Sequence, residues 1–120
     1  MRKPLWYHIR YQMPVYVYED EAGRRPFEEW FNALPADYAT KVLVARGRIE
    51  AGHTGGLKPV GSGVLEWRID WGPGLRLYVA FDGPRLVLLL GGGTKRRQQA
   101  DIRAAQERWA DYQKRKVRRK

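Results

Sequence analysis

Four side chains on two neighbouring strand-like segments are of the types that act on phosphate esters. Glu66 and Arg68 alternate with apolar residues in the first segment, and Arg76 and Tyr78 do so in the second. Cleavage of RNA by its own 2′-hydroxyl needs a base, a cation that braces the phosphate, and an acid for the leaving oxygen. Arginine can supply the cation, tyrosine a donor, and a glutamate with a raised pKa the base. These residue types predict a metal-independent phosphodiesterase site.

The loop between the two segments decides which polar side chains face one another. Gly72-Pro73-Gly74 is typical of a three-residue hairpin loop, which would place Arg68 opposite Tyr78. The same register would place Asp70 opposite Arg76, with apolar residues on the other face of the sheet. Two interpretations stay open. The polar face is either a catalytic surface or a solvated sheet face with ordinary cross-strand ion pairs, each of which adds little stability.

A second turn extends this polar face onto a third strand. Asp82-Gly83 favours a two-residue type I′ turn, and the strand after it would run over residues 85–90. This turn would bring Arg85, Val87 and Leu89 onto the polar face. We therefore expect a charged plate rimmed by apolar residues.

Two lysines flank the polar segments in the sequence. Lys58 follows a predicted helix, and Lys95 follows the glycine run 91–93. Each lysine, taken alone, is typical of an exposed surface residue. The run that ends at Lys95 resembles a phosphate loop that opens onto a helix, but it lacks the spacing of a nucleotide-binding loop. We keep both lysines as candidate phosphate contacts and expect no nucleotide cofactor.

The surrounding sequence predicts the elements that would hold these residues. They are a strand at 15–18, helices at 26–34 and 37–51, antiparallel strands at 64–71, 75–81 and 85–90, and a helix at 94–113. Pro35 separates the first two helices, and Thr94 is a candidate N-cap of the last. The predicted fold class is α+β, with a strand, a helical hairpin, a mostly antiparallel three-stranded meander and a C-terminal helix.

Composition narrows the class of protein. A chain of 120 residues with 43% hydrophobic residues is expected to form one domain over residues 1–120. The absence of cysteine excludes disulfides and thiolate metal sites, and the two histidines, His8 and His53, are too far apart in sequence to suggest a zinc site. No apolar run approaches the roughly 18 residues of a membrane span. We expect a soluble, cytoplasmic protein without a metal or other cofactor.

Charge predicts a polyanionic partner. The net charge is +10, and six bases without an acid lie in residues 114–120. This run is typical of a solvated tail that could hold phosphates without reading sequence. At the other end, residues 1–13 form an N-terminal extension that could add a strand or an ordered arm.

Four ordered motifs resemble the addiction-module killer proteins, a HigB-like, phage-associated branch of the RelE/ParE superfamily of toxins. The resemblance covers about residues 15–110, and its motifs lie at 26–30, 58–69, 72–78 and 88–105. It implies the RelE-like fold, with the working surface on the sheet face and the adjoining loops. It also implies the toxin of a type II toxin–antitoxin system, which cleaves mRNA on the ribosome, inhibits translation and is neutralised by a helix-turn-helix antitoxin encoded beside it.

The resemblance also implies a set of catalytic residues. Carried onto this sequence, they are Lys58, Arg68, Arg76, Tyr78 and Lys95, to which the strand pattern adds Glu66. HigB-like nucleases can use histidines late in the sheet, and this chain has none after His53. The alternatives are a ParE-like gyrase poison with the same fold and a nonenzymatic nucleic-acid-binding protein.

Overall fold

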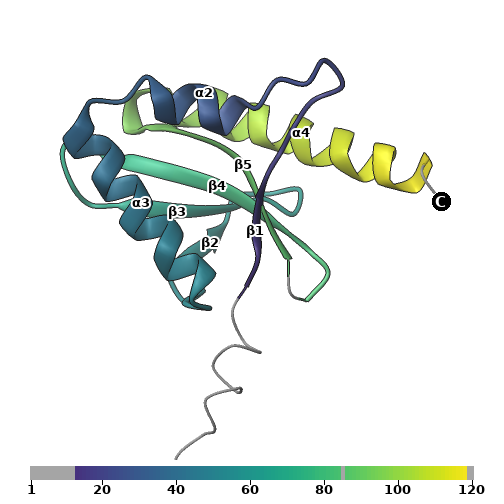
Figure 1. Cartoon of the computed structure of the whole chain (residues 1–120), viewed down its shortest axis with the longest axis horizontal. Coiled ribbons are helices and arrows are strands. Elements are labelled where there is room, and N and C mark those ends of the chain that lie inside the picture. The colour runs from purple at the N-terminus through teal and green to yellow at the C-terminus, as the bar shows by residue number, and fades with distance from the viewer. Residues whose placement is uncertain (1–12, 85, 119–120) are drawn as a thin grey trace, which may run out of the picture.

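A computed structural model of the chain describes residues 13–84 and 86–118 (Figure 1). The elements in chain order are β1 (Val15–Val17), α2 (Pro26–Asn32), α3 (Ala36–Glu50), β2 (Leu57–Pro59), β3 (Leu65–Ile69), β4 (Leu75–Asp82), β5 (Leu86–Thr94), the 3-10 turn η1 (Lys95–Arg97) and α4 (Gln98–Arg118). The predicted N-terminal extension lies outside the described residues except for Met13, and so does Arg85.

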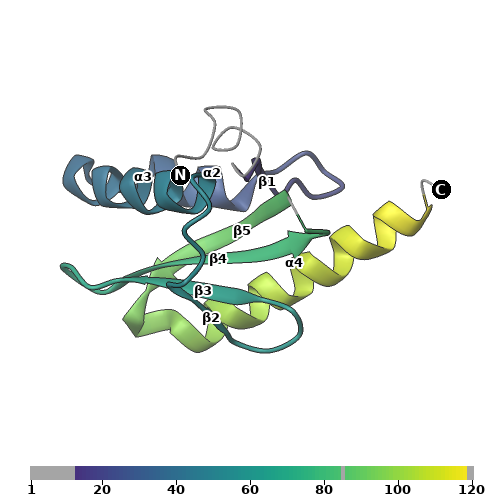
Figure 2. The same cartoon turned by 90° about the horizontal axis from the view of Figure 1, so that it is seen from below.

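One five-stranded sheet forms the middle layer, in the order β1-β5-β4-β3-β2. The helices α2 and α3 cover one face and α4 covers the other, as Figure 2 shows. We call these the hairpin face and the α4 face. Because successive strand residues point to opposite faces, Leu75, Leu77 and Val79 join the core under the hairpin, whereas Tyr78 and Ala80 join a second core under α4.

The helical hairpin forms as the sequence predicts. Pro26 occupies the first turn of α2, and the spacing of Phe27, Trp30 and Phe31 directs all three rings toward the hairpin-face core. Pro35 is the N-cap residue of α3 and separates the two helices. The hairpin therefore presents one apolar stripe to the sheet.

The sheet is larger than predicted and it is mixed. The α+β class and the C-terminal helix are confirmed, but the meander is extended by β2, a short strand for which no prediction was made from the sequence. The strand β1 pairs with β5 in parallel, from Val15 beside Val87 to Val17 beside Leu89. Three residues of β2 are too few to show a period, which is why the sequence did not reveal the strand.

The register between β3 and β4 differs from the prediction by two residues. Ile69 pairs with Leu75, so the loop spans residues 70–74 and is not the expected three-residue loop. Within it, the amide of Gly74 donates to the carbonyl of Trp71 at 3.1 Å. A shift of two preserves which face each side chain occupies but changes its partner. Arg68 therefore lies opposite Arg76 instead of Tyr78.

The register between β4 and β5 also differs, and here the faces change. Asp82 pairs with Leu86, so the expected two-residue turn is wrong. In the predicted register Pro84 would have opened the ladder, and proline has no N–H to donate. Because the shift is odd, Val87 and Leu89 lie in the hairpin-face core and not on the polar face.

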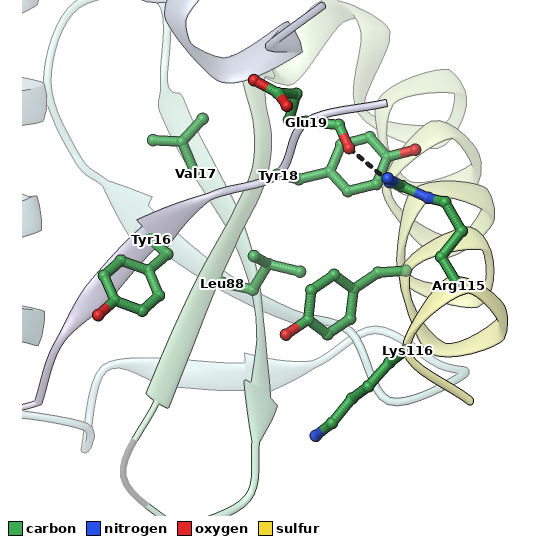
Figure 3. A pocket seen from close by; sticks show the side chains of 8 residues that line it. Tyr16, Val17, Tyr18, Glu19, Leu88, Arg115 and Lys116 are labelled. Atoms are coloured by element: carbon green, nitrogen blue, oxygen red, sulfur yellow. Dashed lines mark hydrogen bonds between the residues drawn. The ribbon is translucent and has the colours of Figure 1, made fainter. Parts of the chain in front are cut away.

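The last helix is longer than predicted and takes up most of the basic tail. It begins at Gln98, after η1, and continues to Arg118. Arg115 forms an ion pair with Asp111 at 2.9 Å. It also donates to the backbone carbonyl of Glu19, and Figure 3 shows this hydrogen bond. Lys116 pairs with Asp82. Part of the tail is therefore anchored to the body, so the expectation of a freely solvated tail is wrong for these two bases.

The same end of α4 borders a groove of about 270 Å³ between β1 and the helix. Tyr16, 60% exposed, and Leu88 contribute to its wall (Figure 3). The buried Tyr18 donates its hydroxyl to Asp111 at 2.6 Å. Burial and then this carboxylate raise the pKa of Tyr18 to about 12. The phenol therefore stays protonated and fastens α4 to β1.

Within residues 13–84 and 86–118, no helix has both the length and the apolar character that crossing a membrane requires.

Candidate functional site

The polar residues predicted from the sequence occupy two adjacent rows on the α4 face. One row runs across three strands from Lys58 to Glu66 to Tyr78, and the next holds Arg68 beside Arg76. Residues that lie directly opposite each other in an antiparallel pair point to the same face. All five side chains therefore start from one side of the sheet.

Most of this cluster is buried, which the sequence did not predict. Glu66, Arg76 and Tyr78 are 2%, 5% and 0% exposed, because α4 lies over this face. The side chain of Arg68, by contrast, is 54% exposed. The expectation of a solvated charged plate is therefore wrong, and the expected pairing of Arg76 with Asp70 is replaced by a buried pairing with Glu66.

The carboxylate of Glu66 is the hub of the cluster. One of its oxygens accepts a hydrogen bond from Arg68 Nε at 2.9 Å. The other accepts one from Gln98 Nε2 at 2.9 Å and lies 3.6 Å from Arg76 Nε. A single buried carboxylate thus orients two guanidinium groups.

These partners keep Glu66 ionised. Burial opposes its ionisation, but the hydrogen bonds from Arg68, Gln98 and Tyr78, together with the charge of Arg76, outweigh that effect and lower its pKa below the ordinary value. A general base near neutral pH needs a raised pKa. The condition under which Glu66 would serve as the base is therefore not met, and its geometry suits it to hold the two arginines in place.

Two further buried polar groups lie beside the Glu66 carboxylate, namely Arg76 Nε at 3.6 Å and the Tyr78 hydroxyl, and both help to lower the pKa of Glu66. Arg76 donates through its Nη1 to the carbonyl of Gly74 at 2.8 Å. Burial, and next the charge of Glu66, raise the pKa of Tyr78. Both groups therefore stabilise the charge of Glu66 from within the core.

The two lysines lie at different borders of the cluster, and both are exposed. Lys58 is on β2, opposite Glu66. Lys95 opens η1, where its amide donates to the carbonyl of Pro73 in the β3–β4 loop at 3.4 Å. This loop also holds the carbonyl that accepts from Arg76. Lys95 is therefore close to the arginine pair, and Lys58 flanks the carboxylate from the other side.

The structure adds three residues that the candidate set lacked. Gln98 reaches the Glu66 carboxylate from the start of α4. Arg96 and Arg97 follow Lys95 in η1 and are exposed. Among the described residues, these two arginines form no ion pair within 4.0 Å. The run of three bases was visible in the sequence, but only the fold brings it next to the cluster.

The glycine run 91–93 is part of β5 and neither ends the strand nor forms a phosphate loop. A Cβ on Gly92 would lie 2.3 Å from the Trp30 ring on the hairpin face. On the α4 face, a Cβ on Gly93 would lie 2.0 Å from the Asp101 carboxylate. These glycines allow helices to approach closely on both faces, which keeps α4 against the cluster.

The arrangement can stabilise negative charge without a metal. Two guanidinium groups are held by one carboxylate, a protonated phenol lies beside them, and the exposed Lys58 and Lys95 lie at the borders of the cluster. Among the described residues, no three His, Cys, Asp or Glu side chains gather as metal ligands would. Such a set is suited to a phosphodiester whose charge grows during attack.

Comparison with known proteins gives a relative for this α+β protein with a buried arginine–carboxylate cluster. No family model matches the chain. Over 80 residues, 66% of this chain and 81% of the relative, it is 39% identical to an uncharacterized protein of Haemophilus influenzae. The chain belongs to the same family as that protein.

Proposed function

We propose that this protein is the toxin of a type II toxin–antitoxin system, a metal-independent endoribonuclease that cleaves mRNA on the ribosome and thereby inhibits translation. The observation that carries the proposal is the cluster in which Glu66 holds Arg68 and Arg76 beside the phenol of Tyr78. The resemblance of its motifs to the HigB-like branch of the RelE/ParE superfamily supports the same function.

In this proposal the role of each side chain follows from how exposed it is. Arg68 contacts the scissile phosphate, because its side chain is the exposed member of the pair. Arg76 adds positive charge from below. Tyr78 is fully buried behind the arginines and does not touch the RNA, so water protonates the leaving oxygen. Lys58 and Lys95 contact the flanking phosphates. Because Glu66 is a weak base, water accepts the proton of the attacking 2′-hydroxyl, and the rate depends on the alignment of that hydroxyl and on charge stabilisation.

The partners follow from the proposed reaction. The ribosome supplies the aligned mRNA, and the cognate antitoxin, a helix-turn-helix protein encoded beside the toxin, neutralises it. Action on translating ribosomes places the protein in the cytoplasm.

Induction of the chain in a bacterial host without its antitoxin tests the proposal. We expect growth arrest, codon-phased cuts in cellular mRNA detected by primer extension, and recovery when the neighbouring gene is co-expressed. Intact transcripts with accumulated cleaved DNA would indicate a gyrase poison instead. Normal growth with abundant folded protein, together with RNA binding but no cleavage, would indicate a nonenzymatic nucleic-acid-binding protein.

A further inference from the structure

Gln98 lies on α4 and hydrogen-bonds to the Glu66 carboxylate. Among the described residues, the other side chains that contact this carboxylate come from strands. Gln98 Nε2 donates to Glu66 Oε2 at 2.9 Å, across 32 positions in the sequence. The other carboxylate oxygen is held by Arg68. Both carboxylate oxygens are therefore held, one by Arg68 on β3 and the other by Gln98 on α4.

The second oxygen is weakly held without Gln98. The other groups beside the carboxylate are Arg76 Nε, which lies 3.6 Å from Oε2 and so beyond normal hydrogen-bond length, and the buried phenol of Tyr78. A carboxylate held at only one oxygen can rotate about its last torsion, and the guanidinium bound to it would move with it. The orientation of Arg68 thus depends on Gln98 through the carboxylate that both residues contact.

We propose that Gln98 is a positioning residue, which locks the Glu66 carboxylate so that Arg68 is presented to the RNA phosphate in a fixed orientation. This inference rests on the proposed function for its effect on cleavage, but not for its effect on Glu66 itself. A hydrogen bond to a carboxylate favours the ionised form. Loss of the Gln98 donor should therefore weaken the hold on the charge and raise the pKa of Glu66.

The helix contains a matched control. Gln106, also on α4 and partly buried, donates its Nε2 to the backbone carbonyl of Val60 at 3.2 Å. Both glutamines thus tie α4 to the sheet side of the molecule through one side-chain hydrogen bond, but only Gln98 does so through Glu66. Gln98→Met and Gln106→Met keep the volume and remove the donor in each case.

The experiment compares the two variants as full-length proteins. The Glu66 side-chain carboxyl is titrated by carbon-detected NMR, and cleavage of mRNA on programmed ribosomes is measured across pH. We expect Gln98→Met to raise the midpoint of the Glu66 titration and to slow cleavage roughly tenfold. Gln106→Met should leave the Glu66 titration and the cleavage rate unchanged. The two variants should have similar melting temperatures, so a difference in cleavage cannot be attributed to stability.

Equal effects of the two substitutions on titration and cleavage would overturn the inference, because Gln98 would then act only through α4 packing. An unchanged Glu66 titration in Gln98→Met would also overturn it. If the wild-type protein does not cleave mRNA, the proposed function fails, and the NMR titration still decides whether Gln98 positions Glu66.

Discussion

The two faces of the sheet are built differently although they share the same strands. On the hairpin face the buried core is entirely apolar, with Leu77, Val79 and Leu89 packed against α2 and α3. On the α4 face the core is interrupted by Glu66 and Arg76, which are as deeply buried as the apolar residues around them. The hairpin face needs no further explanation than hydrophobic burial.

The α4 face does need one. A buried ion pair can often be replaced by apolar residues without loss of stability, so stability alone does not account for the charges. The half-exposed Arg68 and the buried phenol of Tyr78, both beside Glu66, also lie on this face. The comparison suggests that one face holds the fold together and the other carries the proposed chemistry.

The largest effect should come from breaking the buried pair. Arg76→Ala leaves the buried Glu66 with only the half-exposed Arg68 as a counter-charge and should lower the free energy of unfolding by about 3 kcal/mol. The hairpin-face substitution Leu77→Ala should cost about 2–5 kcal/mol for a different reason, a cavity. Urea unfolding measures both.

A double variant separates these two causes. Glu66→Leu combined with Arg76→Leu removes both charges together and should recover most of the stability lost in Arg76→Ala, while mRNA cleavage stays abolished. If the double variant is as unstable as Arg76→Ala, the ion pair itself stabilises the α4 face. Both faces would then serve mainly to hold the fold together, contrary to our inference.

Arg68 should show the opposite balance, with a large effect on activity and little on stability. Loss of one charge-stabilising contact typically slows a reaction by about a hundredfold or more. Arg68→Ala should therefore relieve toxicity and slow mRNA cleavage by about that factor. It should lower the melting temperature less than Arg76→Ala does, since the Arg68 side chain is half exposed and Arg76 still lies 3.6 Å from Glu66. Arg46→Ala, on α3 and paired with Glu50, is the control and should stay fully toxic. Full cleavage activity in Arg68→Ala would remove the α4 face as the site.

Acid should weaken the α4 face. The pKa of Glu66 is lowered in the folded protein, so its contribution to stability is present above the ordinary glutamate pKa of about 4.3 and is lost as pH falls below it. Urea unfolding between pH 6 and pH 3 should therefore show a loss of stability that Glu66→Gln reduces. Glu29, whose pKa is also lowered, by Arg24, is exposed on α2, and Glu29→Gln should reduce the loss much less because solvent screens that pair.

The smallest effect should be on RNA binding, and it compares arginines that form no ion pair among the described residues with arginines that are ion-paired. Arg96 and Arg97 are exposed next to the cluster, whereas Arg24 and Arg25 are engaged by acidic side chains near α2. The slope of the logarithm of the RNA-oligonucleotide binding constant against the logarithm of salt concentration should become shallower by about 0.7 per lost phosphate contact. The double variant Arg96→Ala with Arg97→Ala should therefore change this slope by about 1.4. Arg24→Ala with Arg25→Ala removes the same charge, and an equal change in slope would mean that binding follows net charge and not position.

The sequence by itself determined the parts of this protein that depend on neighbours in the chain. Proline positions and apolar spacing gave the helical hairpin, and alternation gave β3 and β4 together with the face on which Glu66, Arg68, Arg76 and Tyr78 lie. These patterns are local, because helix and strand periods are properties of short segments. The residue types alone also suggested phosphate chemistry, which stays a prediction.

Only the tertiary structure decided register, burial and pairing. The loop at residues 70–74 and the turn before Leu86 each allowed more than one register, and the choice moved Val87 from one face to the other. Whether Glu66 is a base or a holder of arginines depended on α4, whose first residue comes 32 positions later and both covers and hydrogen-bonds to it. A pKa is set by the groups that surround a carboxylate in space, and the chain order does not contain that information.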